Sequence, residues 1–357
     1  MARRPRRTIG SLDTRSDAIL RAVIDEYVTS ATPVSSGSLV EHYPLGVSSA
    51  TVRNILSDLE ALGLLTHPHT SAGRVPTDAG YRYYVQVLAD EQSLPAVEQR
   101  MIRHQFGQVE FASEHWFRLA ASTLAANTGT AGLATTAKPR AARVRRVDLV
   151  AVQDRLALLV VLFREGTMKQ TLQNLPAATD QEQLDRVAGL LNVLAVDRTA
   201  DEIGAALTDL PAGEESFDDL DLLRRIGDTL VRTMSEFDAT LIDDLFSDGL
   251  LNVMAAPEFD RSDKVRAVFA ALENRAYLGS LVESVARAGS IQIFIGHENR
   301  PLEMQDVSLV LAPYGRIGHA IGVVGVLGPT RMPYAQAIAS VDFVSGLMNE
   351  LVEHLYA

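Results

Sequence analysis

The chain has 357 residues, of which 47% are hydrophobic and 22% are charged, so it is long enough for two or three domains with substantial cores. It contains no cysteine, which excludes disulfide bonds, thiolate catalysis and cysteine-ligated zinc or iron–sulfur sites. Residues 1–12 lack the apolar core of a signal peptide, and no apolar run approaches the roughly 20 residues of a membrane span, so we expect a cytoplasmic protein without a membrane partner.

The net charge of −12 is unevenly distributed along the chain. Through Asp90 there are 9 arginines and 9 acidic residues, which cancel, so the remainder carries the whole −12. A neutral N-terminal part on an acidic body is what a DNA-binding module joined to a non-binding body should look like. The N-terminal Arg3, Arg4, Arg6 and Arg7 form either an arm for phosphates or a basic terminus without a role.

Three helices are predicted next, and a short turn joins the second to the third. The first, over residues 16–30, places its apolar side chains on one side, and Pro33 ends it. These apolar side chains are Ile19, Leu20, Val23, Ile24, Tyr27 and Val28. A short helix over residues 36–43 follows, and Pro44-Leu45-Gly46 turns the chain into a third helix. Two helices joined by a glycine-containing turn are typical of a helix-turn-helix.

The third helix is predicted between Ser48, a good N-cap, and Gly63, a natural C′ residue. Its buried stripe consists of Val52, Ile55, Leu56, Leu59 and Leu62. Its other face carries hydroxyls, one amide and one guanidinium, from Ser49, Thr51, Arg53, Asn54 and Ser57. Arginine can bond guanine and asparagine can bond adenine in a fork, so we predict that this face and Ser48 bind DNA. An ordinary solvated face is the alternative.

The segment after this helix is predicted to form a strand–loop–strand ribbon, because HPHTSAGRVPT holds Gly73 between two prolines. Arg74 at the ribbon tip is then placed to enter a minor groove or bind a phosphate, and His69 is predicted as a further DNA contact. Thr77 caps the following helix, in which Tyr81, Tyr84, Val85 and Leu88 pack back on the domain. Arg82 on that helix is expected to face solvent.

The remaining elements are taken from their periodicity. A helix is predicted from near Val97 toward Asn127, a loop over residues 128–142, and three antiparallel strands over residues 143–175. Thr179, with Glu182 three residues on, has capping-box spacing and opens a helical region to about Leu245. A strand-like LLNVMAA follows. We then expect helices over residues 263–273 and 278–288, strands IQIFIG, VSLVLAPY and AIGVVGVL, and a terminal helix over residues 334–355.

No constellation in the sequence predicts catalysis, a metal or a cofactor. Gly318, Gly322, Gly325 and Gly328 lack the strand, helix and acidic residue of a dinucleotide loop, so we interpret them as strand and turn glycines. The pairs His67/His69 and His297-Glu298 lack a third ligand at zinc spacing. The chain also has no nucleophile elbow and no phosphate-binding loop, so we expect no enzyme.

Several runs together resemble one family. LGVSSATVRN and PHTSAGRVPTDAGYRYYV are similar to the HrcA-type heat-inducible repressors of bacteria, and IGHEN, VSLVLAPYG and LGPTRMPY follow at the expected places. The resemblance covers nearly the whole chain. It departs at Ser35-Ser36-Gly37, where the family usually has glycine, serine and a basic residue, which weakens the expectation of a phosphate contact from the second helix.

The resemblance implies an α+β fold with an N-terminal winged helix-turn-helix domain over residues 1–92. A GAF-like α/β domain with an antiparallel sheet is implied in two parts, 93–178 and 257–357. Between them, residues 179–256 would form an inserted, mainly helical dimerising domain.

The resemblance also implies a function and its partners. A homodimer would bind double-stranded DNA at an inverted-repeat operator upstream of chaperonin and DnaK operons and repress them until heat shock, with the chaperonin GroEL modulating its activity. Two alternatives stay open: a metabolite-sensing regulator with a ligand in the GAF-like pocket, and an interaction module with a vestigial winged domain.

Overall fold

The computed structural model describes residues 12–68, 73–88, 93–108, 113–137, 141–164, 166–210, 218–239, 245–259, 262–316 and 320–356. The chain divides into two compact units, which are described separately. Unit 1 consists of Met1–Thr135, Asp244–Tyr314 and Val323–Met348, and unit 2 of Thr136–Asp243, Gly315–Gly322 and Asn349–Ala357. The mixture of helices with antiparallel sheets confirms the predicted α+β class.

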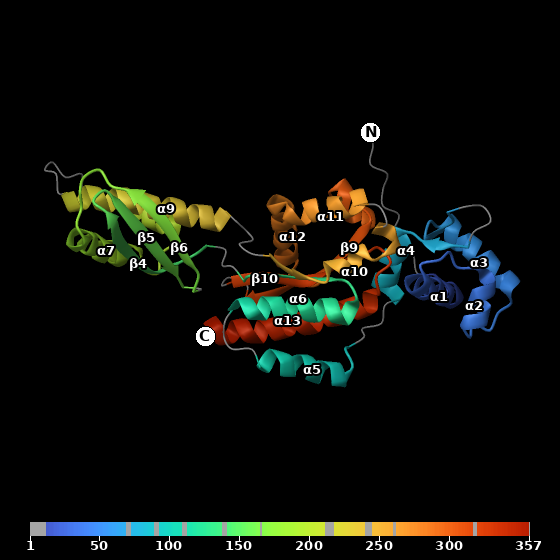
Figure 1. The fold of residues 1–357 in the computed structure, drawn as a ribbon. Helices are drawn as coiled ribbons and strands as arrows, with labels where there is room; N and C mark the ends of the chain where they lie inside the picture. Colours follow the sequence, from blue (N-terminus) through green and yellow to red (C-terminus); the bar gives the residue numbers. More distant parts are fainter. Residues whose placement is uncertain are drawn as a thin grey trace. The chain divides into compact units, whose positions relative to one another are not determined.

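Unit 1 begins with three helices and a two-stranded antiparallel ribbon, in the predicted order (Figure 1). The elements are α1 (Thr14–Ser30), α2 (Ser36–His42), α3 (Ser49–Ala61), β1 (Leu65–Thr66) and β2 (Val75–Pro76). Leu20, Leu39 and Leu59 are each at most 1% exposed and form the small core between the helices. Leu62 was predicted in the buried stripe, but it is the C-cap residue of α3 and is 51% exposed.

Helix α4 (Asp78–Tyr83) follows the ribbon and continues into a π-helical turn, Tyr84–Leu88. The Thr77 hydroxyl accepts a hydrogen bond from the Gly80 amide at 3.1 Å, so the predicted cap of α4 is confirmed. The next two helices are α5 (Ala96–Gly107) and α6 (Ser113–Thr128). They occupy the stretch in which a single helix was predicted.

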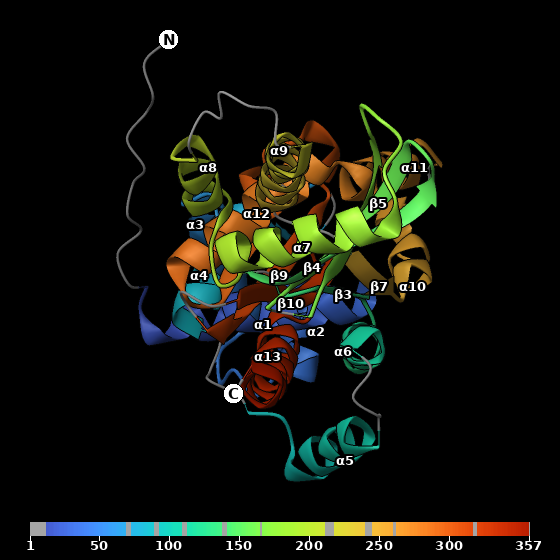
Figure 2. The ribbon, with the colours of Figure 1, turned by 90° about the vertical axis from the view of Figure 1, so that its left-hand side faces the viewer.

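A five-stranded sheet in the order β7-β3-β10-β9-β8 forms the centre of unit 1. The strands are β3 (Ala131–Thr135), β7 (Leu245–Asp248), β8 (Gln292–Ile295), β9 (Val307–Arg316) and β10 (Ala320–Pro329). Helices α6 and α13 (Tyr334–Tyr356) cover one face of this sheet, and α11 (Ser262–Glu273) and α12 (Arg275–Ala288) lie on the other (Figures 1 and 2). The helices, the last strands and the terminal helix thus confirm the predicted elements of this region.

Two local predictions in unit 1 are wrong. Residues 128–142 were expected to form a loop, but they contain β3, which is buried along its whole length between β10 and β7. Its small side chains are required by close packing, because a Cβ on Gly132 would lie 1.9 Å from the carbonyl oxygen of Ala121 on α6. The strand-like LLNVMAA forms a helix, α10 (Leu250–Met254), directly after the short strand β7.

Unit 2 packs a three-stranded antiparallel sheet against helices, and its strands are the three predicted over residues 143–175. Its elements are β4 (Val144–Gln153), β5 (Leu156–Phe163), β6 (Met168–Asn174), α7 (Gln181–Ala195), α8 (Ala200–Thr208) and α9 (Asp218–Ala239). Asp180, not Thr179, caps α7, because its carboxylate accepts from the Gln183 amide at 2.8 Å.

The division of the chain differs from the expected boundary between residues 178 and 179. Strands β4–β6 share one hydrophobic core with α7–α9, in which Val161, Leu191 and Ile226 are fully buried. The strands therefore belong with the inserted helices, and the insertion begins at Thr136. The physical reason is the alternation in β5: every second side chain faces the helices of unit 2, so these strands have no buried face left for the five-stranded sheet.

Candidate nucleic-acid interface

The N-terminal half of α3 is a capped helix end with no acidic residue in its first turn. The Ser48 hydroxyl accepts a hydrogen bond from the Thr51 amide at 3.2 Å and lies 3.0 Å from the Thr51 hydroxyl. The remaining first-turn amides and the helix dipole give this end a partial positive charge. A polyanion is therefore favoured at this end of α3.

The predicted contact residues divide into those with internal partners and those without. Ser49 donates to the Ser36 hydroxyl at 3.1 Å, and Ser57 donates to the backbone carbonyl of Arg53 at 3.1 Å. The side chains of Arg53 and Asn54 are exposed, and within the described residues neither has a hydrogen-bonding or ionic partner. A guanidinium and an amide, one beside the other and free to bond, are thus presented outward from the same turn.

Arg74 directly precedes Val75, the first residue of β2. Its backbone exchanges hydrogen bonds with Val34 at 2.9 and 2.7 Å, which fixes it beside Val75 on the loop side of the ribbon. Its guanidinium pairs with Glu60 near the C-terminal end of α3 at 2.8 Å, and only 23% of the side chain is exposed. Arg74 therefore ties the ribbon to α3 in this structure. His69 lies outside the described residues.

Arg82 was expected to face solvent, and this prediction is wrong. It donates to both carboxylate oxygens of Glu298 and, at 2.6 Å, to the carbonyl of Ile293. On the same helix, Asp78 accepts from the backbone amide of His297 at 2.9 Å and lies 2.7 Å from its Nδ1. The His297-Glu298 pair, considered above only as metal ligands, binds α4 instead, a role that two residues in a loop do not reveal by their spacing.

A second contact joins α1 to the segment before α13. Arg331 donates to the carbonyl of Val28 at 3.0 Å and to Glu258 at 2.5 Å. The rings of Tyr81 and Tyr334 lie beside this pair, with centroids 5.5 Å apart. Burial raises the pKa of both tyrosine hydroxyls, so they stay neutral.

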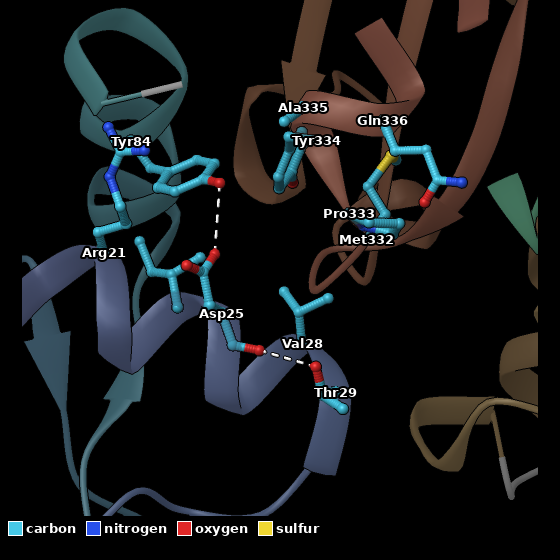
Figure 3. Close-up of a pocket in the computed structure, with 11 residues that line it drawn as sticks. Arg21, Asp25, Val28, Thr29, Tyr84, Met332, Pro333, Tyr334, Ala335 and Gln336 are labelled. Atoms are coloured by element: carbon cyan, nitrogen blue, oxygen red, sulfur yellow. Dashed lines mark hydrogen bonds between the residues drawn. The ribbon is translucent and has the colours of Figure 1, made fainter. Parts of the chain in front are cut away.

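A cavity of about 300 Å³ lies between α1 and the same segment (Figure 3). Arg21, Asp25 and Val28 line it from α1, and Met332 and Gln336 line it from the other side. Burial raises the pKa of Asp25, although the hydroxyl of Tyr84, which donates to it at 3.4 Å, opposes the shift. None of the residues that line this cavity lies in the five-stranded sheet.

The glycine run in β10 has a structural explanation. A Cβ on Gly325 would lie 2.1 Å from the carbonyl oxygen of Val310 in the neighbouring strand, so only glycine fits there. Gly322 and Gly328 lie in the same strand, which confirms them as strand glycines. Gly318 lies outside the described residues.

Two features of the described residues bear on other functions. They contain no group of three or more histidine, aspartate or glutamate side chains that could hold a metal ion. No helix among them is both long enough and apolar enough to cross a bilayer.

Comparison with known proteins identifies the family. Residues 114–338 match the family model described as the HrcA protein C-terminal domain. The heat-inducible transcription repressor HrcA of Roseiflexus castenholzii is 41% identical over 345 residues, covering 97% of this chain and 96% of that protein. The repressor of the same name from Herpetosiphon aurantiacus is 41% identical over 347 residues, with 97% and 96% coverage.

A solved structure shares the fold. The crystal structure of a hypothetical protein at 2.2 Å resolution superposes with a TM-score of 0.62 at 22% identity, covering 97% of this chain and 100% of that one. The identities and coverage of the curated relatives, together with the family model, show that the chain belongs to the HrcA family of heat-inducible transcription repressors.

Proposed function

We propose that residues 1–92 form a winged helix-turn-helix domain in which α3 reads operator DNA and the β1–β2 ribbon is the wing. The observation that carries the proposal is the pair Arg53 and Asn54, exposed and without partners among the described residues, at the positive end of α3. These two groups have the chemistry for forked bonds to guanine and adenine. Ser48, Ser49, Thr51 and Ser57 then contact phosphates or bases around them.

We propose that Arg74 fixes the position of the ribbon relative to this surface. Its pairing with Glu60 holds the ribbon against the C-terminal end of α3. His69, in the loop between the two ribbon strands, is proposed to reach the DNA beside α3.

The dimer is proposed to form through unit 2. The outer face of its sheet carries exposed apolar side chains beside the Arg146–Asp148 ion pair: Val150, Met168 and Leu172 are 45%, 54% and 60% exposed. Val150 and Leu172 flank Leu158 in one cross-strand row, and Met168 faces Leu162 in another. Exposed apolar patches of this kind mark interfaces. A second copy of the chain would cover the face, and a two-fold dimer calls for an inverted-repeat operator.

The regulatory part of the proposal rests on the family resemblance. The operator lies upstream of chaperonin and DnaK operons, and GroEL maintains the DNA-binding form until unfolded proteins compete for the chaperonin during heat shock. A marginally stable fold is sufficient for this, since about 1–2 kcal/mol changes the active population severalfold.

Footprinting on DNA upstream of the chaperonin operon of the protein's own genome tests the proposal. We expect protection of an inverted repeat, at lower protein concentration when GroEL is added. Protection that ignores GroEL but responds to a metabolite extract would support the metabolite-sensing alternative. The absence of any protected repeat would contradict operator binding.

A further inference from the structure

We infer that the IGHEN and LGPTRMPY segments are a docking clamp that holds the N-terminal helices on the five-stranded core and thereby sets the spacing of the two recognition helices in the dimer. The docking clamp consists of two contacts, one between α4 and residues 293–298 and one of Arg331 with α1 and Glu258. None of its residues lies on the exposed face of α3. The inference rests on the proposed function, because it concerns how operator binding is organised.

The first contact is polar and sterically close. Arg82 uses three hydrogen bonds to bind Glu298 and the carbonyl of Ile293, and 26% of its side chain is exposed. Glu298 also accepts from the Ile295 amide at 3.0 Å, so its carboxylate is oriented before Arg82 reaches it. Bidentate arginine–carboxylate pairs of this kind fix orientation as well as contact.

Gly296 allows α4 and residues 293–298 to approach closely at this contact. It has a φ of +49°, and a Cβ built on it would lie 2.4 Å from the Asp78 carboxylate. Glycine is therefore needed for the His297 amide to reach Asp78. The glycine and histidine of the IGHEN run are explained by this approach, and its glutamate by the pairing with Arg82.

The second contact is more deeply buried. The side chains of Arg331 and Glu258 are 16% and 23% exposed. Arg331 also donates to the carbonyl of Val28, near the C-terminal end of α1. This hydrogen bond attaches α1 to the core. Oε2 of Glu258 has no hydrogen-bond partner among the described atoms, so Arg331 provides the compensation for this carboxylate.

Apolar packing between the N-terminal helices and the core is interrupted on one side of the docking clamp. A cavity of about 300 Å³ lies between α1 and residues 332–336 (Figure 3), whereas the rings of Tyr81 and Tyr334 pack together with centroids 5.5 Å apart. The polar contacts on either side then carry more of the orientation than they would in a filled interface. Two recognition helices at a fixed separation convert the second half-site contact into an intramolecular event.

The test compares two clamp variants with a matched control. Arg82→Ala opens the first contact, and Arg331→Gln with Glu258→Gln opens the second without leaving an unpaired buried carboxylate. Arg287→Ala is the control, because it removes an exposed arginine–glutamate pair on α12 of unit 1 that lies outside the clamp. Binding is measured to a duplex with one half-site, to the full inverted repeat, and to repeats whose half-sites are a few base pairs further apart.

We expect both clamp variants to bind the half-site within about twofold of wild type and the full repeat about tenfold more weakly, because the gain from bivalent binding is lost. They should also tolerate the longer spacing better than wild type, and Arg82→Lys should restore part of the spacing dependence. Clamp variants with the affinity and spacing dependence of the control would overturn the clamp. Wild-type protein that shows no preference for the repeat would instead contradict the proposed function.

A measurement without DNA distinguishes failure of the docking clamp from failure of the proposed function. Two cysteines are introduced for spin labelling, Val40→Cys on α2 and Leu302→Cys on the core, and both positions are exposed. Because the chain has no cysteine of its own, the label attaches at these two positions alone. In labelled chains diluted with unlabelled protein, the label-to-label distance distribution should be narrow in the otherwise unchanged chain and broad with either clamp variant. An equally narrow distribution in the variants would overturn the clamp, whatever the DNA result.

Discussion

At the scale of single residues, arginine side chains take different roles according to their neighbours. Arg53 has no partner among the described residues and is exposed, whereas Arg74 pairs with Glu60 and Arg82 pairs with Glu298. All three were visible in the sequence as basic residues in or near the predicted recognition helix. What the sequence could not show is the position of Glu60 and Glu298, because the second of these lies more than two hundred residues from its partner in the chain.

Asp25 provides a test at this scale. Burial raises its pKa in the folded protein, so folding disfavours the charged carboxylate, and stability present at acid pH is lost as the pH rises above about 3.9 through the folded pKa. Asp25→Asn removes that loss and still accepts from Tyr84. Urea unfolding should therefore find the variant more stable than wild type at pH 7, with the difference shrinking toward acid pH. A difference of constant size at all pH values would contradict this explanation.

At the scale of elements, the predicted helices and strands follow from side-chain periodicity where an element has one buried face. This holds for α1, α3, α13 and the strands of unit 2. It fails for β3, whose sequence AGLAT is buried on both faces and consists of small residues, and for α10, which is a single turn beside a sheet edge. Periodicity also cannot show which sheet a strand joins, so β4–β6 were placed with the wrong helices.

At this scale, two substitutions of Ser48 distinguish its role as helix N-cap from its proposed contact with DNA. Ser48→Asp keeps an N-cap acceptor and favours the helix dipole, so we expect a thermal stability within about 0.5 kcal/mol of wild type. The added negative charge faces the proposed phosphates, so operator affinity should fall at least tenfold in gel shifts at low salt. Ser48→Ala is the comparison: it should cost about 1 kcal/mol of stability through the lost cap. An operator affinity of Ser48→Asp equal to that of wild type would contradict the proposed DNA contact at the start of α3.

At the scale of the whole molecule, each unit has its own core, and the proposed functions divide accordingly. Unit 1 carries α3, the proposed DNA-reading helix, and unit 2 carries the sheet face with the exposed apolar side chains. A repressor for an inverted repeat needs both, because one recognition helix reads only one half-site. Binding and symmetry are thus proposed to reside in separate parts of the chain.

The dimer surface is tested by introducing a charge on each exposed apolar face of unit 2. Leu172→Glu places a carboxylate on the outer sheet face, where it would be desolvated in the proposed interface, so we expect monomers and a loss of more than about 2 kcal/mol in dimer stability. Val193→Glu is the matched control on α7, where Val193 is 85% exposed. Light scattering measures the mass of both. A monomeric Val193→Glu beside a dimeric Leu172→Glu would move the interface to α7.

The most direct measurement is the affinity of wild type, Arg53→Ala and Asn54→Ala for the inverted repeat upstream of the chaperonin operon and for an unrelated duplex of the same length. Each substitution should weaken operator binding by about 1–3 kcal/mol per subunit and leave binding to the unrelated duplex nearly unchanged for Asn54→Ala, because an amide contributes base recognition but no charge. Operator affinities equal to that of wild type in both variants would contradict the reading of DNA by α3.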